Sequence, residues 1–193
     1  MPTPERTSLT DIVAAGRDLL EAGGPSRLTM QAVAERVGVR APSLYKRVRD
    51  RDALLGLVAA ATVEELGERL AAADPTVAGL ALAFRTFAHE RPEGFRLMQT
   101  VGAEPAEPAA LERASAPVLR VAADLVGPAQ ALDAARLVTA WATGFLTMEL
   151  AGAFRLGGDV AQAFEFGVAR LTAALAPAGP AGPAPEGGVG SAA

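Results

Sequence analysis

Two short helix-forming segments meet at a glycine, Gly38, and this arrangement limits the chain to few folds. The segment before Gly38 begins after Thr29, a residue type that caps helices, and carries an apolar stripe at helical spacing: Met30, Val33, Ala34 and Val37. The segment after it opens with Pro42, which is tolerated in the first turn because no N–H bond is lost there. Glycine readily adopts the left-handed backbone that a sharp turn requires. The pattern predicts a helix-turn-helix whose second helix covers residues 41–47.

Positive charge is concentrated around this turn. Residues 36–51 hold six Lys and Arg side chains and one acid, Asp50, whereas the whole chain has a net charge of −4. Residues 1–50 carry a net charge of +2, and the remaining residues carry −6. A positive surface on an acidic protein is typical of contact with a polyanion, and the second helix of a helix-turn-helix is the one that enters the DNA major groove. We therefore expect double-stranded DNA as a partner.

The rest of the chain also predicts helices. Ala and Leu are abundant, and no stretch alternates as a strand does. We expect a first helix over 8–22, a fourth from Asp50 to Ala73, and others over 76–90, 93–101, 108–126, 129–156 and 160–175. The sequence thus predicts an all-α protein in three parts: a helix-turn-helix DNA-binding domain (1–50), a larger helical effector-binding and dimerisation domain (51–176), and a disordered Ala-, Pro- and Gly-rich tail (177–193).

The composition offers little for catalysis or metal binding. The chain has no Cys and a single His, His89, which leaves no thiolate or His-rich metal site and no catalytic Ser/His/Asp set. We expect no cofactor and no enzyme, a helical enzyme being the least favoured alternative. The polar start, Met1 to Leu9, is unlike a signal peptide, and the longest uncharged apolar run, Leu137 to Met148, has 12 residues where a membrane span needs roughly 20. We expect a cytoplasmic protein that does not enter membranes.

Several short motifs of the chain occur together in one family. In the N-terminal part they are Leu28-Thr29, the run from Val33 to Val39, Leu44-Tyr45 and the run from Arg51 to Leu55. In the C-terminal part they are Trp141-Ala142-Thr143-Gly144, the run from Glu149 to Phe154, segments 84–89 and 92–98, Asp159 and Phe164. With these motifs the chain resembles the TetR/AcrR family of one-component transcriptional regulators, in the subgroup named for a Trp-His-Gly motif. Thr143 stands where that motif has His.

The resemblance implies roles for residues around the turn. It implies that Tyr45 contacts a DNA phosphate through its hydroxyl while its ring packs on the core; the alternative is a buried Tyr with a satisfied hydroxyl. Lys46 is expected at a phosphate or a base edge. Thr29 and Arg51 stand at helix N-termini, which favour phosphate. Base-reading side chains lie at the leading end of the recognition helix, which here carries Arg40, Ala41, Pro42 and Ser43. For Arg40 the alternative is a solvated turn residue.

The large, soft side chains of the second half are the candidates for an effector site. They are Phe84, Phe87, Phe95, Met98, Trp141, Phe145 and Met148. Aromatic residues at helical spacing usually pack against each other as core, which is the alternative; the resemblance implies that these line a cavity. Thr143 and Thr147, on one face of the same helix as Trp141, are expected to hydrogen-bond the ligand. The alternative for them is a bond to the carbonyl four residues back.

The last two long helices are expected to form a four-helix interface between two copies of the chain. The residues predicted at this interface are Gly152, Phe164, Val168 and Leu171. Together these expectations describe a homodimeric, ligand-responsive regulator, a repressor released from a palindromic operator by a small lipophilic effector. The main alternative is an architectural DNA-binding protein without an effector.

Overall fold

The computed structural model describes residues 8–101 and 108–176, and all regular structure within them is helical, as predicted. The helices are α1 (Leu9–Gly23), α2 (Met30–Arg36), α3 (Ala41–Leu44), α4 (Arg51–Ala72), α5 (Val77–Glu90), α6 (Pro92–Val101), α7 (Pro108–Val126), α8 (Ala131–Leu150) and α9 (Val160–Leu175). The predicted tail, 177–193, lies outside the described residues. Among the described helices, none is both long enough and apolar enough to cross a membrane.

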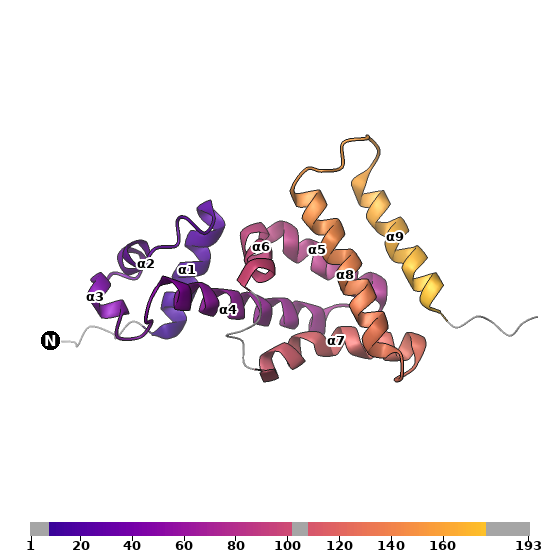
Figure 1. Ribbon diagram of the computed structural model, residues 1–193, viewed down its shortest axis with the longest axis horizontal. Helices are drawn as coiled ribbons and strands as arrows, with labels where there is room; N and C mark the ends of the chain where they lie inside the picture. The colour runs from indigo at the N-terminus through magenta and orange to yellow at the C-terminus, as the bar shows by residue number, and fades with distance from the viewer. Residues whose placement is uncertain (1–7, 102–107, 177–193) are drawn as a thin grey trace, which may run out of the picture.

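Helices α1 to α3 form a small head at one end of the molecule (Figure 1). Each of the first two helices is capped as its sequence predicts: the Ser8 side chain accepts from the Asp11 backbone N–H, and the Thr29 side chain accepts from the Ala32 N–H. Gly38 has a φ of 73°, so the turn between α2 and α3 uses the left-handed conformation that favours glycine. The head core is formed by buried aliphatic residues, among them Ile12, Leu20, Leu28, Val33, Leu44 and Val48.

Helix α4 joins the head to the rest of the chain, which we call the body (α5 to α9). Its 22 residues give a length of about 33 Å at 1.5 Å per residue, and Figure 1 shows it running from the head into the body, with α7 on one side and α5 and α6 on the other. Leu54 and Val58, in its first half, are buried in the head core, whereas Leu70 is buried in the body core. One continuous helix therefore contributes to both cores.

The body ends in α8 and α9, which lie side by side and antiparallel at the end farthest from the head (Figure 1). The predicted helix over 129–156 was too long, because α8 ends at Leu150 and Gly152 follows with a φ of 62°. The second helix of the helix-turn-helix is also shorter than predicted: α3 ends at Leu44, and residues 45–47 form a turn. Neither correction changes the order of the helices.

Candidate functional site

The first candidate site is the outer face of the helix-turn-helix. Two buried side chains, Leu44 and Val48, anchor α3 and the turn after it to the head core. This anchoring leaves the opposite face exposed to solvent, and it carries Pro42, Ser43, Tyr45 and Lys46. The Tyr45 side chain is 54% exposed, so the alternative of a buried tyrosine is wrong.

Some Arg side chains around the turn pair with acidic residues, whereas other Arg and Lys side chains there have no acidic partner among the described residues. Arg36 pairs with Asp18 at 3.0 Å, and Arg49 pairs with Asp50 at 2.7 Å. The Asp50 carboxylate also caps α4 by accepting from the Ala53 N–H at 2.8 Å; this bond and the one from Arg49 lower the pKa of Asp50. In the part of the chain that the structure describes, no ion pair involves Arg40, Lys46 or Arg47.

Two predicted DNA-binding residues have contacts within the head itself. The Arg51 guanidinium donates to the carbonyls of Leu28 at 2.9 Å and Pro25 at 2.5 Å, which ties the start of α4 to the α1–α2 loop. The Thr29 hydroxyl accepts the cap bond of α2 at 3.1 Å. Arg40 precedes α3 as its N-cap without making a side-chain cap bond, and Ala41 is partly buried. Seven of the eight predicted residues therefore lie in the head, whereas Arg51 begins α4 and its side chain contacts the α1–α2 loop.

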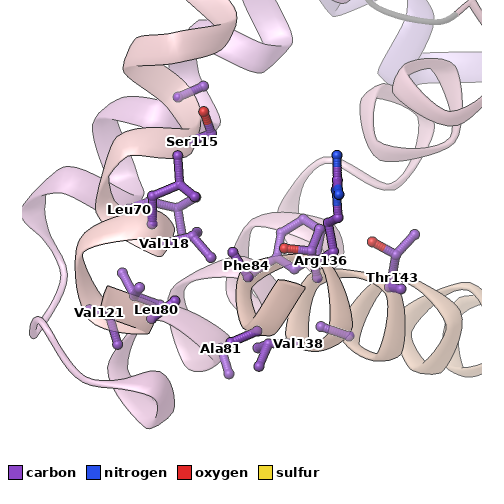
Figure 2. Close-up of a pocket in the computed structure, with 18 of the residues that line it drawn as sticks. Leu70, Leu80, Ala81, Phe84, Ser115, Val118, Val121, Arg136, Val138 and Thr143 are labelled. Carbon is purple, nitrogen blue, oxygen red and sulfur yellow. The ribbon is translucent and has the colours of Figure 1, made fainter. Parts of the chain in front are cut away.

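The second candidate site is a cavity of about 750 Å³ in the body, between α4, α5, α7 and α8 (Figure 2). Its walls are mostly aliphatic, and it opens to solvent where exposed residues of α8 and α7, such as Leu132 and Leu111, line its edge. A volume in this range and a mostly apolar lining are typical of small-molecule sites. The lining includes Val63, Leu66, Leu70, Leu80, Ala81, Val118, Val121, Leu125, Ala135, Val138, Thr139 and Ala142.

Of the nine predicted ligand-binding residues, Phe84, Met98 and Thr143 line this cavity. The other six are placed elsewhere. Phe87 and Phe95 are fully buried core, and Met148 is largely exposed. The Thr147 hydroxyl donates to the Thr143 carbonyl at 2.7 Å, which is the backbone bond named above as the alternative. The remaining two, Trp141 and Phe145, pack in an aromatic cluster with Phe164.

Most of the cavity wall was therefore missed by the sequence analysis. Helix α7 contributes Leu111, Ala114, Ser115, Val118, Leu119, Val121, Ala122 and Leu125. These residues recur at helical spacing, which predicts that this face of α7 packs against the body. A space left open beside it depends on the sizes of side chains from six helices, α4 to α9, and no local pattern records that.

Helix α6 connects the cavity to the head. Its first backbone N–H groups, those of Glu93 and Gly94, donate to the carboxylate of Glu21 on α1 at 3.2 and 2.8 Å. One turn further along α6, Leu97 is buried in the head core, and its neighbour Met98 lines the cavity. Any ligand that displaces Met98 therefore acts on a helix that is fixed to the head by two kinds of contact.

The predicted dimer residues on α9 face their own subunit. Phe164 and Val168 are buried in the body core, because α9 turns this stripe toward α5 and α8. The prediction that Phe164 and Val168 contact a partner subunit was therefore wrong, because their side chains point into their own subunit. Leu171 is partly buried, and Gly152 is exposed in the turn after α8. Helices α8 and α9 leave four large apolar side chains exposed: Leu132, which lines the cavity edge, and Leu137, Met148 and Phe166.

A charged group ties α5 to the end of α8. The Arg85 guanidinium donates to both carboxylate oxygens of Glu149, at 2.5 and 3.1 Å, and lies 5.3 Å from the centre of the Phe164 ring. His89 lies 3.3 Å from the same carboxylate. The hydrogen bonds from Arg85 hold the pKa of Glu149 below its ordinary value of 4.5, although burial acts in the opposite direction.

Two segments of the chain match families of known proteins. Residues 12–58 match the family described as Bacterial regulatory proteins, tetR family, and residues 77–171 match the family described as Tetracyclin repressor-like, C-terminal domain. An uncharacterized HTH-type transcriptional regulator of Mycobacterium tuberculosis is 30% identical over 159 residues, which cover 77% of this chain and 73% of that protein.

Solved structures with similar folds come from several bacteria. BioQ of Mycobacterium smegmatis is 25% identical, with a TM-score of 0.59 over 88% of this chain and 97% of that one. A TetR regulator of Streptomyces coelicolor is 20% identical, with a TM-score of 0.67 over 87% and 97% of the two chains. A TetR variant of Acinetobacter baumannii, solved in complex with minocycline, is 24% identical, with a TM-score of 0.65 over 86% and 95%.

Proposed function

The chain belongs to the tetR family of bacterial transcriptional regulators, and from this premise we propose that it is a repressor released from DNA by a small molecule bound in the body. The observation that carries the proposal is the position of α6. Leu97 is buried in the head core and Met98 lines the cavity, so a ligand contacts the same helix that supports the DNA-binding head. The protein then has two states, one that binds the operator and one that does not. An effector shifts the equilibrium between them if its binding free energies for the two states differ by about 1–3 kcal/mol.

On DNA, we propose that the exposed face of α3 enters the major groove of a palindromic operator. Tyr45 and Lys46 contact phosphates from the exposed turn after α3, and Arg40, Pro42 and Ser43 approach base edges at its leading end. Arg51 instead positions the head by fixing the α1–α2 loop. Ala41, which is partly buried, approaches a thymine methyl only at the edge of this surface.

Two copies of the head are brought together by a homodimer. We propose that the dimer forms through the outer faces of α8 and α9, which expose Leu137, Met148 and Phe166. Phe166 is 61% exposed within one subunit, and a second copy would remove it from water. This arrangement leaves Phe164 and Val168 in the core of each subunit.

The effector we propose is a lipophilic small molecule, because aliphatic side chains form most of the cavity. The related regulator of Acinetobacter baumannii was solved with minocycline. Six of the residues first expected to bind the ligand lie outside the cavity, so Phe84, Met98 and Thr143 are the members of that set that we retain.

Binding to an operator fragment tests the DNA part of the proposal. Contacts to six to eight phosphates per dimer predict a slope of about −5 to −7 for log K against log salt concentration. Tyr45→Ala and Lys46→Ala should weaken binding with the helical spectrum unchanged, whereas Arg120→Gln, an exposed change on α7, should not. Binding that ignores salt, or full affinity in both head variants, would contradict this assignment.

Sedimentation tests the dimer. Phe166→Arg places a charge on the proposed interface and should give folded monomers at micromolar concentration, because an unpaired charge is strongly disfavoured in an apolar interface. Such monomers should also lose affinity for the palindrome, since two heads no longer bind together. A variant that sediments as the wild type does would exclude this face as the interface.

A further inference from the structure

The cavity has one charged side chain among the described residues that line it, Arg136 of α8. A guanidinium has five N–H donors and no acceptor. Thr139 and Thr143 line the cavity one and two turns further along α8, and Figure 2 shows Arg136 and Thr143 projecting from the same side of the helix. The α8 wall therefore presents hydrogen-bond donors next to a space that is otherwise mostly aliphatic.

Arg136 has only a weak partner in its own chain. Its guanidinium lies 3.6 Å from the Asp133 carboxylate, and the two side chains are 70% and 83% exposed. Exposed pairs of this kind contribute little free energy. An incoming anion can therefore replace Asp133 at small cost.

The wall opposite α8 offers no comparable donor for an anionic group. Ser115 of α7 also lines the cavity, but its hydroxyl donates to the backbone carbonyls of Leu111 at 2.9 Å and Glu112 at 3.2 Å. Its proton is thus used within α7. Gln99 of α6 also lines the cavity, but its amide is uncharged and cannot pair with an anion as a guanidinium does. The remaining walls are formed largely by Leu, Val, Ala and Phe side chains, which suit the uncharged part of a ligand.

We propose that the effector is an anionic amphiphile: a small molecule whose apolar body fills the cavity and whose carboxylate binds Arg136 at the cavity edge. This inference rests on the proposed function and names the chemical class of its ligand. A carboxylate matches the planar fork of a guanidinium and accepts two N–H bonds from it. Arg136 is then the residue that selects acids over neutral molecules of the same shape.

The test compares two probes that differ only in the head group, dodecanoate and dodecan-1-ol, by titration calorimetry on the full chain below their aggregation concentrations. The wild type should bind dodecanoate about tenfold more tightly than the alcohol. Arg136→Gln should reduce the ratio of the two affinities to about one and leave the alcohol unaffected. Asp133→Asn, which removes the competing carboxylate, should raise the ratio, and Arg120→Gln on α7, outside the cavity lining, should not change it.

Each contrary result identifies what is wrong. Equal affinity of the wild type for the two probes, or an unchanged ratio in Arg136→Gln, overturns the head-group inference while the cavity stays the effector site. A fourth variant, Val118→Trp, narrows the cavity and should weaken the binding of both probes alike. If neither probe binds, or if Val118→Trp leaves both affinities unchanged, the cavity is not their site and the proposed effector site fails with it.

Discussion

The two sides of α8 differ in how side chains fill the space next to them. On one side lies an aromatic cluster, in which Trp141 stacks on Phe164 at 5.3 Å between ring centroids and Phe145 meets Phe164 at 5.2 Å and Phe154 at 4.8 Å. On the other side lies the cavity of about 750 Å³. Successive residues of the helix take different sides: Trp141 joins the cluster, whereas Ala142 and Thr143 line the cavity.

The difference teaches that the aromatic side chains of α8, Trp141 and Phe145, mark filled space rather than a cavity. Rings that pack closely against each other exclude solvent and other ligands, so the cluster is the more rigid side. A cavity remains where several helices present mainly Leu, Ala and Val to each other and none reaches across. The ion pairs follow the same division. Arg85 and Glu149 form a close, largely buried pair over the cluster, and Arg136 and Asp133 form a long, exposed pair beside the cavity.

The largest expected effect is on the filled side. Phe164→Ala removes a ring that packs against both Trp141 and Phe145, and it should lower the free energy of unfolding by about 3–5 kcal/mol. Phe154→Ala is the matched control, because Phe154 contacts the cluster from a partly exposed position and its loss leaves no closed void. Urea denaturation at one protein concentration measures both. Equal losses in the two variants would show that the cluster is not tightly packed.

A smaller loss is expected when volume is added to the same side. A Cβ at Gly167 would lie 2.2 Å from Trp141 Cζ2, and the ring cannot retreat because it stacks on Phe164. Gly167→Ala should therefore destabilise the protein by about 1–3 kcal/mol. At a helical glycine with free space around it, the change to Ala has the opposite effect and stabilises the protein by about 0.5–1 kcal/mol. A raised melting temperature would show that the Trp141 ring is free to move.

The sequence predicted the head more fully than the body for a physical reason. The caps at Thr29 and Asp50 and the turn at Gly38 depend on residues a few positions apart, so local patterns record them. The end of α8 was missed because 151–156 is rich in Ala, Phe and Leu and continues an apolar pattern, while the helix stops at a left-handed Gly152.

The effector site was predicted only in part, because a cavity is the space between helices that their side chains do not fill. Aromatic residues were expected to line it, yet Trp141 and Phe145 fill their own space completely enough to form core. Whether space remains beside Ala142 depends on Val118, Leu66 and Leu80 in three other helices. The direction of α9 is a similar case, because an apolar stripe at Phe164 does not say whether its partner is the same chain or another.

The buried ion pair over the cluster should make stability depend on pH. Because the folded-state pKa of Glu149 is held below its ordinary value of 4.5, the ionised carboxylate stabilises the fold above that value. This stabilisation should decline from about pH 5 downward and vanish below the folded-state pKa. Glu149→Gln should lower the free energy of unfolding by about 1–2 kcal/mol at pH 7 and by progressively less in acid. Urea denaturation of the variant and the wild type at a series of pH values from 7 downward measures this difference. A difference between variant and wild type that stays constant with pH would exclude Glu149 as the titrating group.

The smallest change in stability is expected when volume is added to the open side. Val118 projects into the cavity from α7 (Figure 2). In Val118→Trp the indole ring therefore has space to enter the cavity, where it buries apolar area without displacing a packed neighbour. We expect the free energy of unfolding to change by no more than about 1 kcal/mol, in contrast to the single methyl group added at Gly167. Operator binding should persist, because the head core does not include Val118. Release of the operator by an effector should be lost, because the ring occupies the volume that the ligand needs. A destabilisation as large as that of Gly167→Ala would mean that the space closes in solution, and the contrast between the two sides of α8 would then disappear.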